Sequence, residues 1–359
     1  MRLGLNLGYW GAGSSQLGDG DNLALARAAD ELGYAVVWAA EAYGSDSPTV
    51  LAWVAAQTRR IDVGSAVMQI PARTPAATAM TAATLDSLSG GRFRLGLGVS
   101  GPQVSEGWHG VRFDRPLERT REYVDVVRLA LSRQPLSYAG KHFTLPLPDG
   151  PGKALRLTVH PAREHLPVYL AAMGPRNLEL TGEIADGWLA IFYAPEHAAD
   201  ALDRIRAGRE RAGRTGGGSP GLDGFDVVST VPIVLGDDLE QCAAPVRAYS
   251  ALYLGGMGSR EQNFYHQLAV RMGYGAAASA VQELYLDRRP REAAAAVPLE
   301  FVDRTALIGP PDRVRDRLSA YAESGVTTLS VTVPVGTVDE RIATLRTLAE
   351  ALDASGLAD

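Results

Sequence analysis

Residues 92–121 read RFRLGLGVSGPQVSEGWHGVRFDRPLERTR, and this stretch decides the fold class. Its first part, Phe93 to Val99, is an apolar run with two glycines, a pattern typical of a buried strand that another backbone approaches closely. Residues 101–110 contain too many glycines and polar groups for a regular helix, so we predict a loop there. Polar and aromatic side chains directly after a buried strand are typical of the site of an α/β protein.

The same stretch also fits a dinucleotide-binding fingerprint, because Gly96, Gly98 and Gly101 match G-x-G-x-x-G after a strand. That fingerprint needs a helix that begins at the last glycines and holds the pyrophosphate at its N-terminus. Because Pro102 and a predicted loop follow Gly101, we favour the simpler interpretation, in which small residues let neighbouring elements pack closely.

Strand-like and helix-like segments alternate along most of the chain. The segments with the pattern of buried strands are Leu3–Leu7, Val36–Ala40, Ile61–Val67, Phe93–Val99, Val168–Ala172, Gly187–Phe192, Val227–Leu235 and Thr328–Val333. Strands that alternate with helices form a parallel sheet, so we predict an α/β fold, a (β/α)8 TIM barrel with insertions over its carboxyl-terminal face. An open, doubly wound sheet is the alternative architecture.

Two excursions interrupt this alternation. Residues 137–167 are rich in glycine and proline, which predicts irregular chain with a short hairpin. Residues 238–298 are alanine-rich and helix-like, with breaks near Gly255, Gly273 and Pro290. We expect residues 1–359 to form a single TIM-barrel domain in which both excursions cover the pocket.

The composition narrows the class of protein. The 35 basic and 41 acidic residues give a net charge of -6, so the chain offers no basic face for nucleic acid. A single cysteine excludes an intrachain disulfide, and six scattered histidines show no metal-ligand spacing. Because we find neither a signal-peptide pattern nor a membrane-spanning run, we expect a cytoplasmic protein without a metal centre.

The carboxyl ends of barrel strands meet at one rim, so the residues that follow each predicted strand are site candidates. They are Asn6, Tyr9 and Trp10 at the first strand; Glu41, Tyr43 and Asp46 at the second; Ala66, Val67, Met68 and Gln69 at the third; Gly98, Val99, Ser100, Glu106, Trp108 and His109 at the fourth; and Ala172, Met173, Gly174, Pro175 and Arg176 at the fifth. The aromatic candidates either line a pocket for a flat ligand or pack in the core.

The segment Met173-Gly174-Pro175-Arg176 gives the clearest chemical signal. A glycine followed by a proline indicates the start of a helix, and the free backbone N–H groups of a helix N-terminus bind phosphate. Arg176 adds a fixed positive charge with a fork of donors. The alternative is an ordinary turn with a solvated arginine, and composition alone does not separate the two.

Glu41 directly follows the apolar run Val36–Ala40. A carboxylate there is either an acid or base of the site or the partner of an arginine on the barrel rim, and its position favours the first. Glu106 and His109 are further candidates for proton transfer, although a loop histidine is more often a surface group.

Four blocks of sequence resemble a known family: VWAAEAYGSD (37–46), the segment from VGSAVMQIP to GVRFD (63–114), RPLERTREYVDVVR (115–128) and PVYLAAMGPRNLELTGEIADGWLAIF (167–192). They are similar to the bacterial luciferase-like superfamily, and within it to the coenzyme F420-dependent oxidoreductases related to methylene-tetrahydromethanopterin reductase. The similarity extends over essentially the whole chain, but residues 238–298 carry no specific motif.

This resemblance implies a homodimeric (β/α)8 barrel that holds a deazaflavin ring against a bulge at the end of the third strand. A non-prolyl cis peptide is typical of that bulge and would join Ala66 and Val67. The resemblance also places Glu41 and Glu106 near the ring and the turn at residues 173–176 at the cofactor phosphate.

One position departs from part of the superfamily. Its sugar-phosphate dehydrogenases carry a histidine directly after the acidic residue of the second strand, where this chain has Ala42. We therefore do not carry over their substrate or proton transfer, and the proton donor stays open among Glu41, Glu106, His109 and Tyr9.

The favoured hypothesis is an F420-dependent oxidoreductase that moves a hydride between C5 of the deazaflavin and a small organic substrate. Because the histidine is missing, reduction of an activated C=C or C=N bond is expected rather than alcohol oxidation. The alternatives are an FMN-dependent monooxygenase that uses O2 and a cofactor-binding barrel without catalysis.

Overall fold

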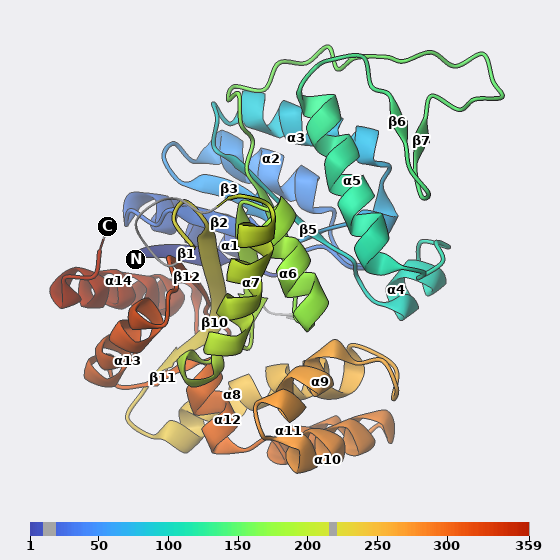
Figure 1. The fold of residues 1–359 in the computed structure, drawn as a ribbon. Helices are drawn as coiled ribbons and strands as arrows, with labels where there is room; N and C mark the ends of the chain where they lie inside the picture. Colours follow the sequence, from blue (N-terminus) through green and yellow to red (C-terminus); the bar gives the residue numbers. More distant parts are fainter. Residues whose placement is uncertain (10–18, 215–220, 359) are drawn as a thin grey trace.

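The computed structural model describes residues 1–9, 19–214 and 221–358. In it, eight parallel strands close into a ring in the order β1, β2, β3, β5, β8, β9, β10, β12 and back to β1 (Figure 1). Their bounds are β1 Arg2–Asn6, β2 Val36–Ala39, β3 Asp62–Ser65, β5 Phe93–Gly98, β8 Val168–Ala171, β9 Gly187–Ile191, β10 Asp226–Leu235 and β12 Thr328–Thr332. The closed ring confirms the predicted barrel and excludes an open doubly wound sheet.

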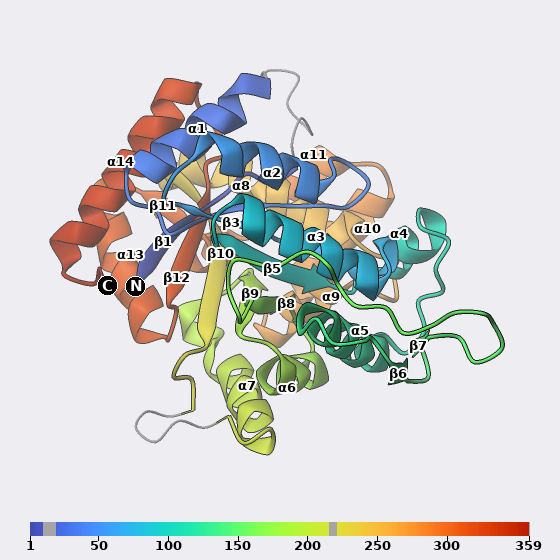
Figure 2. The same cartoon turned by 90° about the horizontal axis from the view of Figure 1, so that it is seen from above.

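Helices follow the strands and surround the ring, as Figure 2 shows from above. Their bounds are α1 Asp19–Glu31, α2 Ser47–Gln57, α3 Pro75–Leu88, α5 Pro116–Leu131, α6 Pro175–Ile184, α7 Ala199–Arg211, α13 Pro311–Glu323 and α14 Val338–Ser355. Side-chain caps begin α2, where Asp46 accepts from Thr49 N, and α14, where Thr337 and Glu340 form a capping box. Such caps satisfy N–H groups that a helix leaves free. None of the described helices is both long and apolar enough to cross a membrane.

A buried polar network lies inside the barrel. Arg94 Nε donates to Asp62 Oδ2 at 2.8 Å, and Arg94 Nη1 forms an ion pair with Asp226 Oδ2 at 3.0 Å. Tyr169 Oη donates to Asp226 Oδ2 at 3.0 Å, and Thr328 Oγ1 donates to Asp226 Oδ1 at 2.8 Å. Because the charged groups are paired and also hydrogen-bonded, the network fixes five strands of the barrel relative to one another.

The segment after β5 differs from its prediction. Residues 102–107 form a short helix, α4 (Pro102–Gly107), where we expected a loop. Pro102 lies in its first turn, where the missing N–H is harmless, and Gly101 is the N-cap residue. Six residues are too few to display a helical period. A helix thus does begin at the last glycine of the fingerprint, and the barrel topology is what excludes the dinucleotide-binding fold.

The first excursion lies along the outside of the barrel (Figure 1). It contains the predicted hairpin, β6 (Tyr138–Ala139) paired with β7 (Thr144–Leu145). The Glu122 carboxylate of α5 accepts hydrogen bonds from the backbone N–H groups of residues 141–143 and so holds the hairpin against that helix.

The end of this excursion lies at the amino-terminal side of the barrel. Arg163 Nε donates to Asp86 Oδ1 near the end of α3 at 2.9 Å, and Arg163 Nη2 donates to the carbonyl of Phe93, the first residue of β5. The expectation that both excursions cover the carboxyl-terminal face is therefore wrong for residues 137–167.

The second excursion forms a helical layer with its own apolar core. Its elements are α8 Leu239–Ala251, the π-helical turn η3 Leu252–Gly256, α9 Phe264–Arg271, α10 Gly275–Leu286 and α11 Pro290–Ala295. The predicted breaks near Gly255, Gly273 and Pro290 separate these helices. A further helix, α12 (Leu299–Thr305), and a short strand, β11 (Leu307–Gly309), follow and were not predicted.

This helical layer covers the carboxyl ends of the strands. The Phe264 ring of α9 lies 6.5 Å from the Phe113 ring in the segment after α4. Arg271 Nη2 donates to the carbonyl of Met173, after β8, at 2.8 Å. The Tyr253 ring lies 5.7 Å from the Phe192 ring, directly after β9. The expectation for residues 238–298 is therefore confirmed.

Candidate functional site

The predicted bulge lies between β3 and β4 (Met68–Gln69), which both pair with β5. Ser65 Oγ donates to the carbonyl of Gly96 at 2.8 Å and accepts from its N–H at 2.9 Å, so the side chain replaces missing ladder bonds. The peptide between Ala66 and Val67 is cis, as the resemblance implied.

Gly96 and Gly98, both in β5, are needed at this bulge. A Cβ atom on Gly96 would lie 1.9 Å from the carbonyl oxygen of Ser65, and one on Gly98 would lie 2.5 Å from Val67 Cγ2. The strand pattern indicated a close backbone approach, and the bulge is the element that makes it.

Gln69 joins three strand ends through hydrogen bonds. Its backbone N–H donates to Glu41 Oε2 at 3.2 Å, and its Nε2 donates to Ser100 Oγ at 2.9 Å. Its Oε1 accepts from His109 Nε2, also at 2.9 Å. Ser100 has a φ of 62°, which is uncommon for serine and typical of functional positions. We call Glu41, Gln69, Ser100 and His109 the rim group.

Glu41 is engaged by an arginine. Arg73 Nη1 donates to Glu41 Oε2 at 2.6 Å and Arg73 Nη2 to Oε1 at 2.7 Å, and Arg73 also pairs with Asp46. The hydrogen bonds from Arg73 to Glu41 raise the pKa of the guanidinium. Both oxygens of Glu41 are occupied by this fork, which supports the rim-arginine interpretation and a positioning role for Glu41.

Glu106 and His109 have different surroundings. Glu106, on α4, is exposed, accepts from Phe113 N at 3.0 Å and forms an ion pair with Arg112 at 3.7 Å. These partners belong to the following loop and not to the rim group. His109 contacts Gln69, so of the two it is His109 that lies within hydrogen-bond reach of the strand ends.

The start of α6 has the geometry that the sequence indicated. Gly174 is the N-cap residue without a side-chain cap, and a Cβ atom there would meet nothing within 4 Å. Arg176 is exposed and forms no hydrogen bond or ion pair with the described residues. Arg271 reaches the same turn from α9 through the Met173 carbonyl. Free N–H groups, an open approach and two guanidinium groups suit an anion.

The remaining candidates are distributed between core and surface. Met68 and Ala172 are buried, Val99 packs against the core, and the Asn6 side chain accepts from Gly8 N at 2.7 Å. Tyr43 and Trp108 are exposed, and Trp10 lies outside the described residues. Among the described residues, no group of three His, Cys, Asp or Glu side chains is placed to hold a metal ion.

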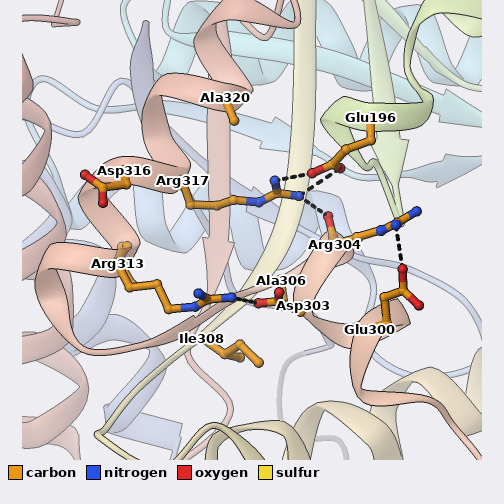
Figure 3. Close-up of a pocket in the computed structure, with 11 residues that line it drawn as sticks. Glu196, Glu300, Asp303, Arg304, Ala306, Ile308, Arg313, Asp316, Arg317 and Ala320 are labelled. Atoms are coloured by element: carbon orange, nitrogen blue, oxygen red, sulfur yellow. Dashed lines mark hydrogen bonds and ion pairs between the residues drawn. The ribbon is translucent and has the colours of Figure 1, made fainter.

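A charged cavity of about 480 Å³ lies between η2 (Pro195–His197), α12 and α13, and none of the predicted site residues lines it (Figure 3). Its arginines are each paired with a carboxylate in the same cavity: Arg317 with Glu196, Arg313 with Asp303, and Arg304 with Glu300. The three arginine charges in this cavity are therefore already compensated.

The structure also brings to the rim residues that sequence reasoning missed. Arg73, the partner of Glu41, is one of them, and the tyrosines of the second excursion are the others. Four tyrosines within residues 249–274 were a visible signal, but no spacing rule connects them to the barrel.

The fold and the rim define the class of protein, a TIM barrel with one helical insertion over the carboxyl ends of its strands. Residues 2–328 match the family model described as "Luciferase-like monooxygenase", and the chain belongs to this family. The resemblance seen in the sequence is thereby confirmed.

Individual relatives agree with this family. The Mycobacterium tuberculosis protein named "Putative coenzyme F420-dependent oxidoreductase Rv3520c" is 44% identical over 337 residues, which are 92% of this chain and 95% of that protein. The 5,10-methylenetetrahydromethanopterin reductase of Archaeoglobus fulgidus is 27% identical over 86% of this chain and 88% of its own length. The solved F420-dependent tetrahydromethanopterin reductase of Methanopyrus kandleri shares the fold, with a TM-score of 0.80, 24% identity and coverage of 98% and 97%.

Proposed function

We propose that this protein is a coenzyme F420-dependent oxidoreductase that transfers a hydride between the deazaflavin C5 and a small organic substrate. The observation that carries the proposal is the open, positively charged start of α6, at the same barrel rim as the Ala66–Val67 bulge. The 44% identical relative, whose name specifies F420, supports this choice of cofactor.

The residues fit the parts of such a cofactor. The N–H groups at the start of α6 and Arg176 would hold a phosphate, and the bulge with Gly98 would support a flat ring. When bound, the deazaflavin supplies the hydride, and the protein fixes its face and distance and excludes water. The hydrogen bond between His109 Nε2 and Gln69 Oε1 at 2.9 Å holds the imidazole ring at the barrel rim.

The proposed direction of hydride transfer is based on the absence of a histidine after Glu41. Ala42 occupies the position at which related sugar-phosphate dehydrogenases have a histidine, so this chain lacks their base for alcohol oxidation. We therefore propose reduction of an activated C=C or C=N bond. The cytoplasmic location and the homodimer are also proposals, the former from the sequence and the latter from the resemblance.

A second candidate is an FMN-dependent monooxygenase that uses O2. The description of the matching family model favours it, because it names luciferase-like monooxygenases. A cofactor-binding barrel without catalysis is the third candidate, and the intact turn at Gly174 speaks against it.

Arg176→Ala is expected to weaken F420 binding by about 1–3 kcal/mol, the range for a lost charge-assisted hydrogen bond. The bound complex should transfer hydride at the normal rate, because Arg176 lies at the phosphate end. Fluorescence titration measures the affinity, and single-turnover kinetics at saturating cofactor measures the rate. Arg346→Ala, on the outer face of α14, is the matched control. If Arg176→Ala and Arg346→Ala bind F420 with equal affinity, the start of α6 is not the phosphate site.

A further inference from the structure

A small pocket lies beside the rim group. It is bounded by η1 (Ile70–Ala72), the end of β5, α4 and the first turn of α5, and its volume is about 20 Å³. Its lining residue Ile70 directly follows Gln69, and its lining residue Val99 directly precedes Ser100. Two members of the rim group therefore adjoin this pocket, which we call the rim pocket.

The lining of the rim pocket is mainly apolar. It includes Ile70 and Pro71 of η1, Val99 after β5, and Val111 and Phe113 in the segment after α4. A water molecule needs a cavity of about 10–15 Å³, so the rim pocket has room for one small group. It can take the apolar end of a ligand but not a whole ligand.

The uncharged polar side chains of the rim pocket are satisfied within the protein. Ser105 Oγ donates to the carbonyl of Val111, and Thr120 Oγ1 donates to the carbonyl of Pro116, both at 2.7 Å. These two hydroxyl groups therefore do not require a ligand.

The two arginines of the rim pocket are not satisfied in the same way. The Arg119 side chain forms no hydrogen bond or ion pair with the described residues, and its Nε atom is buried. Arg112 is largely exposed and forms one long ion pair, with Glu106 at 3.7 Å. None of the described residues that line the pocket is acidic. The rim pocket thus combines an apolar lining with uncompensated positive charge.

Arg119 differs in this respect from the other arginines of α5. Arg121 forms an ion pair with Glu183 at 2.6 Å, and Arg128 forms one with Asp186 at 3.1 Å. Arg119 is half-buried beside apolar side chains, so its guanidinium loses part of its hydration without gaining a partner. A carboxylate supplies the missing partner, because its two oxygens match the fork of guanidinium donors.

We propose that the rim pocket is a subsite for a short-chain carboxylate, whose apolar end enters the pocket while its carboxylate pairs with Arg119. Arg112 adds a second positive charge on the solvent side. Because the pocket adjoins the rim group, we assign this carboxylate to the substrate. That assignment rests on the proposed F420-dependent function, whereas the carboxylate subsite itself does not.

Isothermal titration calorimetry of the full chain with butanoate, and with butanamide as its uncharged counterpart, tests the subsite. The wild type should bind butanoate about 10- to 100-fold more tightly than butanamide, the range for a charge-assisted hydrogen bond. Arg119→Gln should abolish this difference, and Arg119→Lys, which keeps the charge but loses the fork, should retain part of it. Arg346→Gln, at an exposed position on α14, is the control and should bind both probes as the wild type does.

Two results would overturn the carboxylate subsite. One is a wild type that does not bind butanoate more tightly than butanamide. The other is an Arg119→Gln variant that binds butanoate as tightly as the wild type. Either result would leave the proposed F420-dependent function intact, because F420 binding is measured separately.

Titration with F420 tests the assignment to the substrate, because the glutamate tail of F420 also carries carboxylates. Arg119→Gln should bind F420 with wild-type affinity, and butanoate should bind equally well to the F420 complex. Weaker F420 binding in Arg119→Gln, together with competition between F420 and butanoate, would overturn this assignment and give the subsite to the cofactor tail. A wild type that binds butanoate through Arg119 but does not bind F420 would overturn the proposed function and the substrate assignment, and would keep the carboxylate subsite.

Discussion

Asp226→Ala is expected to lower the free energy of unfolding by about 3–5 kcal/mol, because it removes one of the two carboxylates that pair with the buried Arg94 guanidinium and leaves buried donors without their acceptor. Arg94 is almost fully buried, and its ion pair with Asp226 lies inside the barrel. The substitution also removes the acceptor of the Tyr169 and Thr328 hydroxyls. Urea unfolding at neutral pH measures the loss.

The double variant Arg94→Met/Asp226→Leu tests the physical reason for this loss. Apolar residues of similar volume remove both buried charges together, so the double variant should be more stable than Asp226→Ala. A loss below about 1 kcal/mol in Asp226→Ala would show that the network contributes no more than an ordinary hydrogen bond.

Gly96→Ala is expected to lower the free energy of unfolding by about 3 kcal/mol or more, through overpacking and the loss of both Ser65 hydrogen bonds. The new Cβ atom would lie 1.9 Å from the Ser65 carbonyl oxygen, so a strand has to move. Since Ser65 directly precedes the bulge at Ala66, the same shift should weaken F420 binding.

Gly101→Ala is the matched control for this variant. Its φ is -126°, and the nearest atom to an added Cβ is Gln103 Oε1 at 3.6 Å. Its stability should stay within about 0.5 kcal/mol of the wild type, as for most surface substitutions. Thermal unfolding and F420 titration of the two variants measure both effects. If Gly96→Ala has the stability and F420 affinity of the wild type, the backbones of β3 and β5 do not approach closely at Gly96.

Local signals were enough to predict most of the barrel. Apolar runs bounded by turns gave the strands of the ring, and the proline at residue 175 gave the start of α6. These features depend on near neighbours in sequence, which is why they are visible without a structure. The six-residue helix α4 was missed because it is shorter than two turns.

The site depends on contacts between distant residues and was predicted only in part. Glu41 was placed at the rim, but its partner Arg73 follows 32 residues later, and no spacing rule links them. The contact between the rings of Tyr253 and Phe192, directly after β9, likewise needs the second excursion to fold back over the barrel. The first excursion was placed wrongly, because its glycines and prolines predict irregular chain but not the face on which it packs.

The most direct test of the proposed F420-dependent function is a titration of the purified protein with oxidised F420 and, in parallel, with FMN, followed by absorbance and fluorescence. An F420-dependent oxidoreductase should show saturable, tight binding of F420 and no comparable binding of FMN. Tight binding of FMN without binding of F420 would contradict it and would assign the protein to the oxygen-using members of its family.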